Sequence, residues 1–246
     1  MARATFRIWR GQAGDGAFQD YATEVTEGMV VLDAVHQIQA ESASDLAVRW
    51  NCKAGKCGSC SAEVNGKPRL LCMTRLSDLP LDEPVTVEPM RSFPPIKDLV
   101  TDVSWNFRAK QKIRKFEPRP PDAADGTWRM AQEDVDRVQE FRKCIECFLC
   151  QDVCHVLREH HLHEQFAGPR LLVYTAALEM HPLDTGDRLT DLKGGQGIGY
   201  CNITKCCTKV CPENITITDN AIIPLKERVV DEFYDPFKKL LRVFRK

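Results

Sequence analysis

Residues 52–60 read CKAGKCGSC, and one further cysteine follows at position 72. This C-x4-C-x2-C spacing with a distant fourth cysteine is typical of a plant-type [2Fe–2S] cluster. Gly55 and Gly58 would let the loop wrap closely, with backbone N–H groups turned toward the sulfurs, where they disperse negative charge. The predicted ligands of this cluster are Cys52, Cys57, Cys60 and Cys72.

The residues around this loop predict a small β-grasp ferredoxin domain. Apolar and polar residues alternate in several short segments, one segment has helical spacing, and two turns carry glycine. The expected order is strand, strand, helix, cluster loop and further strands. The elements are Thr5–Arg10, a turn at Gly11–Gly16, Tyr21–Val25, a helix over Val30–Ala40, Ser61–Val64, an Asn65-Gly66 turn, Leu70–Thr74 and Val85–Glu88.

The second half of the chain is predicted to be helical. It follows Phe93-Pro94-Pro95, with an amphipathic connecting helix expected over Ile96–Ile113 and an exposed, proline-rich loop over Glu117–Gly126. Further helices are expected at Ala131–Arg142 and Leu171–Leu178. The fold class is therefore α+β, with a [2Fe–2S] ferredoxin-type domain over residues 1–105 and an all-α, bacterial-ferredoxin-like domain over residues 106–246.

Two late cysteine runs resemble each other and form an internal duplication. Cys144–Cys154 reads CIECFLCQDVC, the C-x2-C-x2-C-x3-C run whose fourth cysteine ligates the other of two clusters. Residues 201–212, CNITKCCTKVCP, fit the same template. The predicted [4Fe–4S] ligands are Cys144, Cys147, Cys150 and Cys211. The remaining template positions give the third cluster Cys154, Cys201 and Cys207.

The third cluster lacks a fourth thiolate, because Thr204 stands at the second position of its template. Three thiolates suit a [3Fe–4S] cluster, which generally has a higher potential than a four-iron cluster. Cys206, the twelfth cysteine, fits no template position. It is interpreted either as a free buried thiol or as a replacement ligand that restores a four-iron cluster.

Composition excludes several other classes of protein. The formal net charge of −1 gives no global field that would favour nucleic acid. Disulfides suit a small secreted domain, but the chain opens MARATFRIWR without an apolar signal-peptide core. Zinc is the main alternative for CxxC pairs, but it would not need a wrapped spacer with two glycines. No apolar stretch approaches 18 residues, so we expect no membrane span.

Over nearly its full length the chain resembles the iron–sulfur subunit of succinate dehydrogenase and fumarate reductase. The most specific motifs are Cys52–Cys60, Gly66–Cys72 (GKPRLLC), Glu88–Val100 (EPMRSFPPIKDLV), Cys144–Cys154, Phe166–Leu172 (FAGPRLL) and Cys201–Pro212. The resemblance implies a hetero-oligomeric oxidoreductase of the tricarboxylic acid cycle and respiratory chain.

By this resemblance, a flavoprotein with covalent FAD oxidises succinate. Electrons then pass through the [2Fe–2S], [4Fe–4S] and [3Fe–4S] clusters to quinone in a membrane anchor. The chain holds no substrate, so it has no catalytic residue of its own. It would lie peripherally on the cytoplasmic face of the inner membrane. The alternatives are a quinol:fumarate reductase, which runs the same path in reverse, and the iron–sulfur subunit of another flavoprotein dehydrogenase.

The sequence departs from the family near the expected quinone site. The family usually has a proline after the cysteine at position 154 and tryptophans shortly after it, whereas here the segment is HVLREHHLH, residues 155–163. Asn202 stands where the family often has a histidine. The segment is either a polar interface or a ligand and proton relay near the acceptor. The candidate quinone-side residues are His155, Asn202 and Thr204.

The last ten residues, FKKLLRVFRK, predict a basic amphipathic helix that could lie against an anionic leaflet or pack on a partner subunit. Two further interpretations of the whole chain stay open at this point. One is a freestanding ferredoxin-like carrier, and the other is the iron–sulfur subunit of a thiol-linked fumarate reductase or heterodisulfide reductase.

Overall fold

The computed structural model describes residues 2–236, which divide into two compact units. Within the described residues, the first comprises 2–104 and 145–153, and the second comprises 105–144 and 154–236. The basic tail predicted at 237–246 lies outside the described residues. In the part of the chain that the structure describes, no helix combines the length and apolar character that a membrane span requires.

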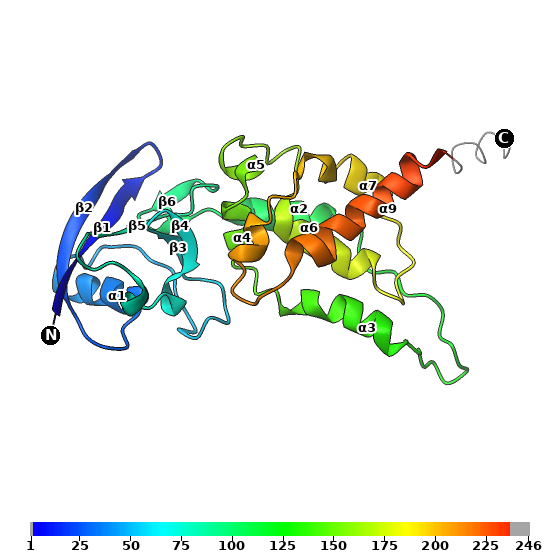
Figure 1. The fold of residues 1–246 in the computed structure, drawn as a ribbon, viewed down its shortest axis with the longest axis horizontal. Helices are drawn as coiled ribbons and strands as arrows, with labels where there is room; N and C mark the ends of the chain where they lie inside the picture. Colours follow the sequence, from blue (N-terminus) through cyan, green and yellow to red (C-terminus); the bar gives the residue numbers. More distant parts are fainter. Residues whose placement is uncertain (1, 237–246) are drawn as a thin grey trace. The chain divides into compact units, whose positions relative to one another are not determined.

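The first unit is built on a five-stranded mixed sheet (Figure 1). The strand order is β2-β1-β5-β3-β4; β1 pairs antiparallel with β2 and parallel with β5, and β3 pairs antiparallel with β5 and β4. Helix α1 buries Val31, Val35 and Ile38, the face predicted from its spacing. The elements are β1 Ala2–Gln12, β2 Asp15–Val25, α1 Val31–Glu41, β3 Ser61–Val64, β4 Lys67–Leu70, β5 Val85–Glu88, β6 Pro95–Lys97, β7 Val100–Thr101 and α4 Leu149–Asp152.

Most predicted elements of this unit are confirmed, and β3 and β5 have the predicted bounds. Strands β1 and β2 run further than predicted, because Gln12 pairs with Asp15 across a two-residue turn.

The strand predicted at Leu70–Thr74 is wrong. Asn65 and Gly66 both have positive φ, as a two-residue hairpin turn requires, so Val64 pairs with Lys67 and β4 ends at Leu70. The chain then turns through a 3-10 helix at Leu71–Met73.

The connecting helix predicted over Ile96–Ile113 forms only in its second half, as α2 Ser104–Lys112. Its first half is the β6–β7 hairpin, whose turn holds Asp98 at φ 49°. The buried Asp98 carboxylate accepts the Gly11 and Ala47 N–H groups at 2.9 and 2.8 Å. These long-range bonds fix the segment to the first unit and override the local helical pattern.

The second unit is helical, as predicted. Its elements are α2, α3 Gln132–Gln139, α5 His155–Arg158, α6 Gly168–Glu179, α7 Leu189–Lys193, α8 Cys206–Lys209, a π-helical turn at Ile217–Ile222 and α9 Ile223–Phe233. Helix α6 buries Leu171, Leu172 and Val173, and it contacts the π-helical turn and α3. Glu117–Gly126 contains no helix or strand, in agreement with the predicted loop.

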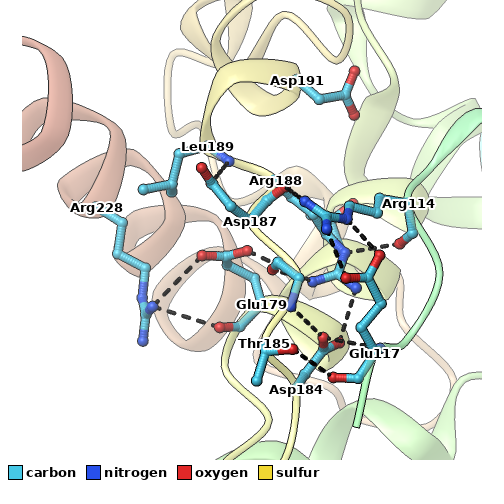
Figure 2. Close-up of polar contacts among 12 residues, drawn as sticks. Arg114, Glu117, Glu179, Asp184, Thr185, Asp187, Arg188, Leu189, Asp191 and Arg228 are labelled. Atoms are coloured by element: carbon cyan, nitrogen blue, oxygen red, sulfur yellow. Dashed lines mark hydrogen bonds and ion pairs between the residues drawn. The ribbon is translucent and has the colours of Figure 1, made fainter. Parts of the chain in front are cut away.

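A buried arginine ties the loop after α6 to the segment that follows α2 (Figure 2). The Arg188 side chain has no exposed surface and ion-pairs with Asp184 at 2.8 Å. Its guanidinium also donates to the carbonyls of Arg114, Gly186 and Lys115 at 2.8, 2.7 and 2.6 Å. Removing this buried charge would strongly destabilise the fold, because its partners would remain buried without a hydrogen-bond donor.

We expect Arg188→Met to lower the free energy of unfolding by about 3–5 kcal/mol. Arg228→Met is the matched control, since the Arg228 side chain is 40% exposed and lies 3.7 Å from Glu179. That change should cost no more than about 1 kcal/mol. Urea unfolding of the purified chain, followed by circular dichroism, measures both values. Equal losses for the two variants would contradict the role given to Arg188.

Candidate iron–sulfur centres

The first cysteine loop lies in the first unit, directly before β3. Backbone N–H groups of Ala54 and Lys56 both donate to the Cys52 sulfur at 3.3 Å. This is the amide wrapping expected around a ligand thiolate. The β3–β4 hairpin places Cys60 and Cys72 as neighbours, because Ser61 pairs with Leu70 and the Leu71 N–H donates to the Cys60 carbonyl. The four predicted [2Fe–2S] ligands therefore lie on one loop and one hairpin end.

The thiols of this loop differ in how readily they ionise. Burial raises the pKa of Cys60 to about 12. Burial also opposes ionisation of Cys57, but hydrogen bonds from Ser59 and from the Cys52 backbone outweigh it and lower the Cys57 pKa to about 6. A buried thiolate needs a nearby positive charge, and a metal ion supplies it. The donor set therefore fits a cluster that carries ferric ions.

The two later runs share one backbone pattern. In the first, Glu146 and Phe148 have φ of 55° and 61°; in the second, Ile203 and Lys205 both have φ of 61°. These are the third and fifth residues of each run. A four-residue helix then begins at the sixth residue, as α4 Leu149–Asp152 and α8 Cys206–Lys209. The structure therefore confirms the internal duplication.

Cys147 and Cys150 are buried in the first unit. The Ser61 hydroxyl donates to the Cys147 carbonyl at 2.8 Å. After Cys150, the Asp152 carboxylate accepts the Ser92 N–H at 2.9 Å. Hydrogen bonds from β3 and from the segment after β5 therefore hold the part of the first run from Cys147 to Asp152 in place.

Cys144 and Cys211 are neighbours in the second unit. Burial raises the pKa of Cys211, and the charge of Cys144 adds to the effect. The Ile215 N–H donates to the Cys211 sulfur at 3.4 Å. Near by, the Glu140 carboxylate accepts the Thr216 N–H and the Asn220 amide at 2.7 and 2.6 Å, which joins the two segments. The assignment of Cys144, Cys147, Cys150 and Cys211 to one cluster stays a prediction.

The three thiols predicted for the third cluster line one small pocket of the second unit. Burial raises the pKa of Cys154 to about 12 and that of Cys207 to about 11. The Thr218 hydroxyl lies 3.5 Å from the Cys207 sulfur. Cys201, Thr204 and Cys206 lie on the same pocket wall. The donor set again fits a cluster, with three thiols from template positions and one extra thiol.

The candidate quinone-side residues also meet at this pocket. His155 and Asn202 directly follow two predicted ligands, and the Asn202 amide nitrogen lies 3.0 Å from His155 Nε2. Sequence pattern did not indicate Thr218, which lies 11 residues beyond Cys207 and outside every motif. Only the path of the π-helical turn brings its hydroxyl to the sulfur.

We expect Gly58→Ala to impair assembly of the first cluster. A Cβ at Gly58 would lie 2.8 and 2.9 Å from backbone atoms of Cys147 and 2.9 Å from the Ile145 carbonyl. Gly66→Ala is the matched control, because Gly66 has the same φ of +69° but nothing within 4 Å of the added carbon. The control should cost about 1 kcal/mol of backbone strain and retain its cluster.

The measurement is the EPR signal of the reduced [2Fe–2S] cluster, relative to the signals of the other clusters in the same sample. The ratio should fall for Gly58→Ala and stay near the wild-type value for Gly66→Ala. Equal ratios in the two variants would show that close packing around Gly58 does not matter for the cluster.

Comparison with known proteins agrees with this geometry. Residues 5–108 match the family described as a 2Fe-2S iron-sulfur cluster binding domain, and residues 140–215 match the 4Fe-4S dicluster domain. The chain is 35% identical over 203 residues to the fumarate reductase iron-sulfur subunit of Mycobacterium tuberculosis, with 80% of each protein covered.

Two further relatives extend the comparison. A fumarate reductase (CoM/CoB) subunit from Methanothermobacter marburgensis is 31% identical over 220 residues, which cover 89% of this chain but 42% of that protein. A chain of the Mycobacterium smegmatis Sdh1 complex in the apo form superposes with a TM-score of 0.91 at 61% identity, covering 95% of this chain and 98% of that one. The predicted fold class and the predicted resemblance are both confirmed. The chain therefore belongs to the family of iron–sulfur subunits of succinate dehydrogenases and fumarate reductases, and it is an electron-transfer subunit of an oxidoreductase.

Proposed function

We propose that this chain is the iron–sulfur subunit of a succinate:quinone oxidoreductase. It would take electrons from the FAD of a flavoprotein subunit and deliver them to quinone held by a membrane anchor. The observation that carries the proposal is the pocket formed by Cys154, Cys201 and Cys207 with Thr204 on its wall. Three thiolates with a non-thiolate residue at the fourth template position suit a three-iron terminal centre.

The ligand assignment follows from the template. Cys52, Cys57, Cys60 and Cys72 would hold the [2Fe–2S] cluster. Cys144, Cys147, Cys150 and Cys211 would hold the [4Fe–4S] cluster, and Cys154, Cys201 and Cys207 the [3Fe–4S] cluster. The repeated left-handed backbone at the same positions of both runs supports the last two sets. When bound, the clusters supply one-electron carriers whose potentials the protein tunes by hydrogen bonds and burial.

The chain's own residues would tune the terminal centre. Thr218 is 1% exposed, and its hydroxyl faces the Cys207 sulfur. A hydrogen bond to a ligand sulfur stabilises the more negative, reduced state and so raises the potential. The missing thiolate at Thr204 acts in the same direction, because it removes one negative ligand.

On the acceptor side, His155 and Asn202 would face the quinone. Their side chains contact each other at the pocket of the third cluster. A histidine can change its protonation near neutral pH, and reduction of a quinone consumes protons. This pair would therefore orient the quinone and supply a proton.

The chain would lie peripherally on the cytoplasmic face of the inner membrane, where the anchor would hold it. The alternative is a quinol:fumarate reductase with the same subunits and the reverse direction of electron flow. The 35% identity between this chain and the fumarate reductase iron-sulfur subunit of Mycobacterium tuberculosis supports this alternative.

Affinity purification of the tagged chain from mild detergent tests the proposal. We expect a flavoprotein with covalently bound flavin and at least one membrane protein to co-purify. The oxidised complex should show the EPR signal of a three-iron cluster. Succinate should reduce a quinone analogue faster than a quinol reduces fumarate if the physiological direction is oxidation. A chain that purifies alone, with full cluster content, would instead indicate a freestanding carrier.

We expect His155→Ala to lower succinate-dependent quinone reduction by roughly a hundredfold, in line with the loss of a positioned proton donor. Succinate oxidation with a soluble acceptor that draws electrons before the third centre should not change. His160→Ala is the control, because His160 is exposed and flanks no predicted ligand. An unchanged EPR signal of the three-iron cluster in both variants would show that the ligands are intact. Unchanged quinone turnover in His155→Ala would rule out the assigned role.

A further inference from the structure

Cys206 is the cysteine that none of the three predicted ligand sets uses. It is the first residue of α8, it is half-buried, and it directly precedes the predicted ligand Cys207. Its side chain lies on the wall of the same pocket as the three predicted ligands of the third cluster. Cys206 is therefore one of four cysteines that line this pocket.

The spare thiol lies next to the residue that replaces the missing ligand. The Cys206 sulfur is 3.2 Å from the Thr204 hydroxyl oxygen. In the first run the corresponding residues are Cys147, a predicted ligand, and Leu149, a buried apolar side chain. The run that lacks a thiolate at its second template position thus has a thiol two residues later.

Cys206 lines the same pocket as Cys154 and Cys207. Cys154 and Cys207 are buried, while Cys201 and Cys206 are half-buried. An ion that entered the pocket from solvent would therefore meet Cys201 and Cys206 before Cys154 and Cys207.

We propose that Cys206 is a conditional fourth ligand of the third cluster, which binds one ferrous ion when that cluster is reduced. The inference rests on the proposed function, because it requires a three-iron cluster on Cys154, Cys201 and Cys207. Thiolate is a favourable ligand for iron in such clusters.

The chemical step balances without a further reductant. The Cys206 thiol releases its proton to water, and its sulfur forms a bond to Fe²⁺. That ion joins the one-electron-reduced three-iron core, of formal charge zero, and completes a [4Fe–4S]²⁺ core. In the reverse step the sulfur–iron bond breaks, Fe²⁺ leaves and the sulfur takes a proton back. Filling the vacant corner removes the higher-potential centre, so electron delivery to the acceptor should slow when ferrous iron is abundant.

The test uses the intact, purified complex. The wild type and Cys206→Ala are reduced with dithionite, incubated with or without ferrous ammonium sulfate, desalted anaerobically and re-poised with a mild oxidant. The readouts are the EPR signal of the oxidised three-iron cluster and the iron content per chain. A [4Fe–4S]²⁺ core is diamagnetic, so conversion appears as a loss of that signal.

We expect the wild type to lose most of its three-iron signal after Fe²⁺ treatment and to gain up to one iron per chain. Cys206→Ala should keep its full signal and gain none. Thr204→Cys in the Cys206→Ala background is the positive control, because a thiolate at the template position should give a four-iron cluster without added iron.

The outcomes separate this inference from the proposed function. If the wild type keeps its signal as Cys206→Ala does, while the Thr204→Cys control lacks it, the role of Cys206 is overturned and the three-iron assignment stands. If no preparation shows a third cluster, the proposed function fails and this inference fails with it.

Discussion

The cysteine runs depend on backbone that ordinary residues adopt at a cost. Glu146, Phe148, Ile203 and Lys205 all have a left-handed conformation, and none is glycine. Such a conformation costs roughly 1–2 kcal/mol per residue, and most for a β-branched side chain such as Ile203. It persists only where other interactions determine it. Burial also raises the pKa of Cys154 and Cys207, so ionising these two thiols is a second cost. Binding of a cluster by the thiols of these runs would offset both costs.

Cysteine spacing indicated that the two late runs share one backbone path, whereas hydrophobic pattern indicated the bounds of only some strands and helices. A spacing such as C-x2-C-x2-C-x3-C describes a backbone path, so two runs with the same spacing fold alike even though Thr204 replaces a cysteine in one. Strand alternation predicted the correct bounds for β3 and β5. It failed at Leu70–Thr74, where the Asn65-Gly66 turn sets the register and ends the strand earlier. The Asn65-Gly66 turn was visible in the sequence. It is a stronger signal than the apolar run, because the turn fixes which residues of β3 and β4 pair, whereas the apolar run does not.

Other features could not be read from the sequence, because they depend on contacts between distant segments. The helical pattern of Ile96–Ile113 is real, but the Asp98 carboxylate binds two amides from far upstream and holds the first half as a hairpin. Likewise, Ser61 and Ser92 hold residues 145–153 within the first unit across 60 or more residues of chain. The contact of Thr218 with a predicted ligand arises in the same way. Local pattern carries no information about these partners.

The duplicated runs also indicate how one backbone can serve two kinds of centre. The left-handed residues occupy the third and fifth positions, whereas the positions at which only one run has a thiol are the fourth and sixth: Cys147 against Thr204, and Leu149 against Cys206. Side-chain changes at the fourth and sixth positions leave the left-handed positions untouched, and both short helices keep four residues. The fold of the run is therefore set separately from its ligand content. An electron carrier built on such a run can alter the iron count and potential of one centre by single substitutions, while the path of the chain stays the same.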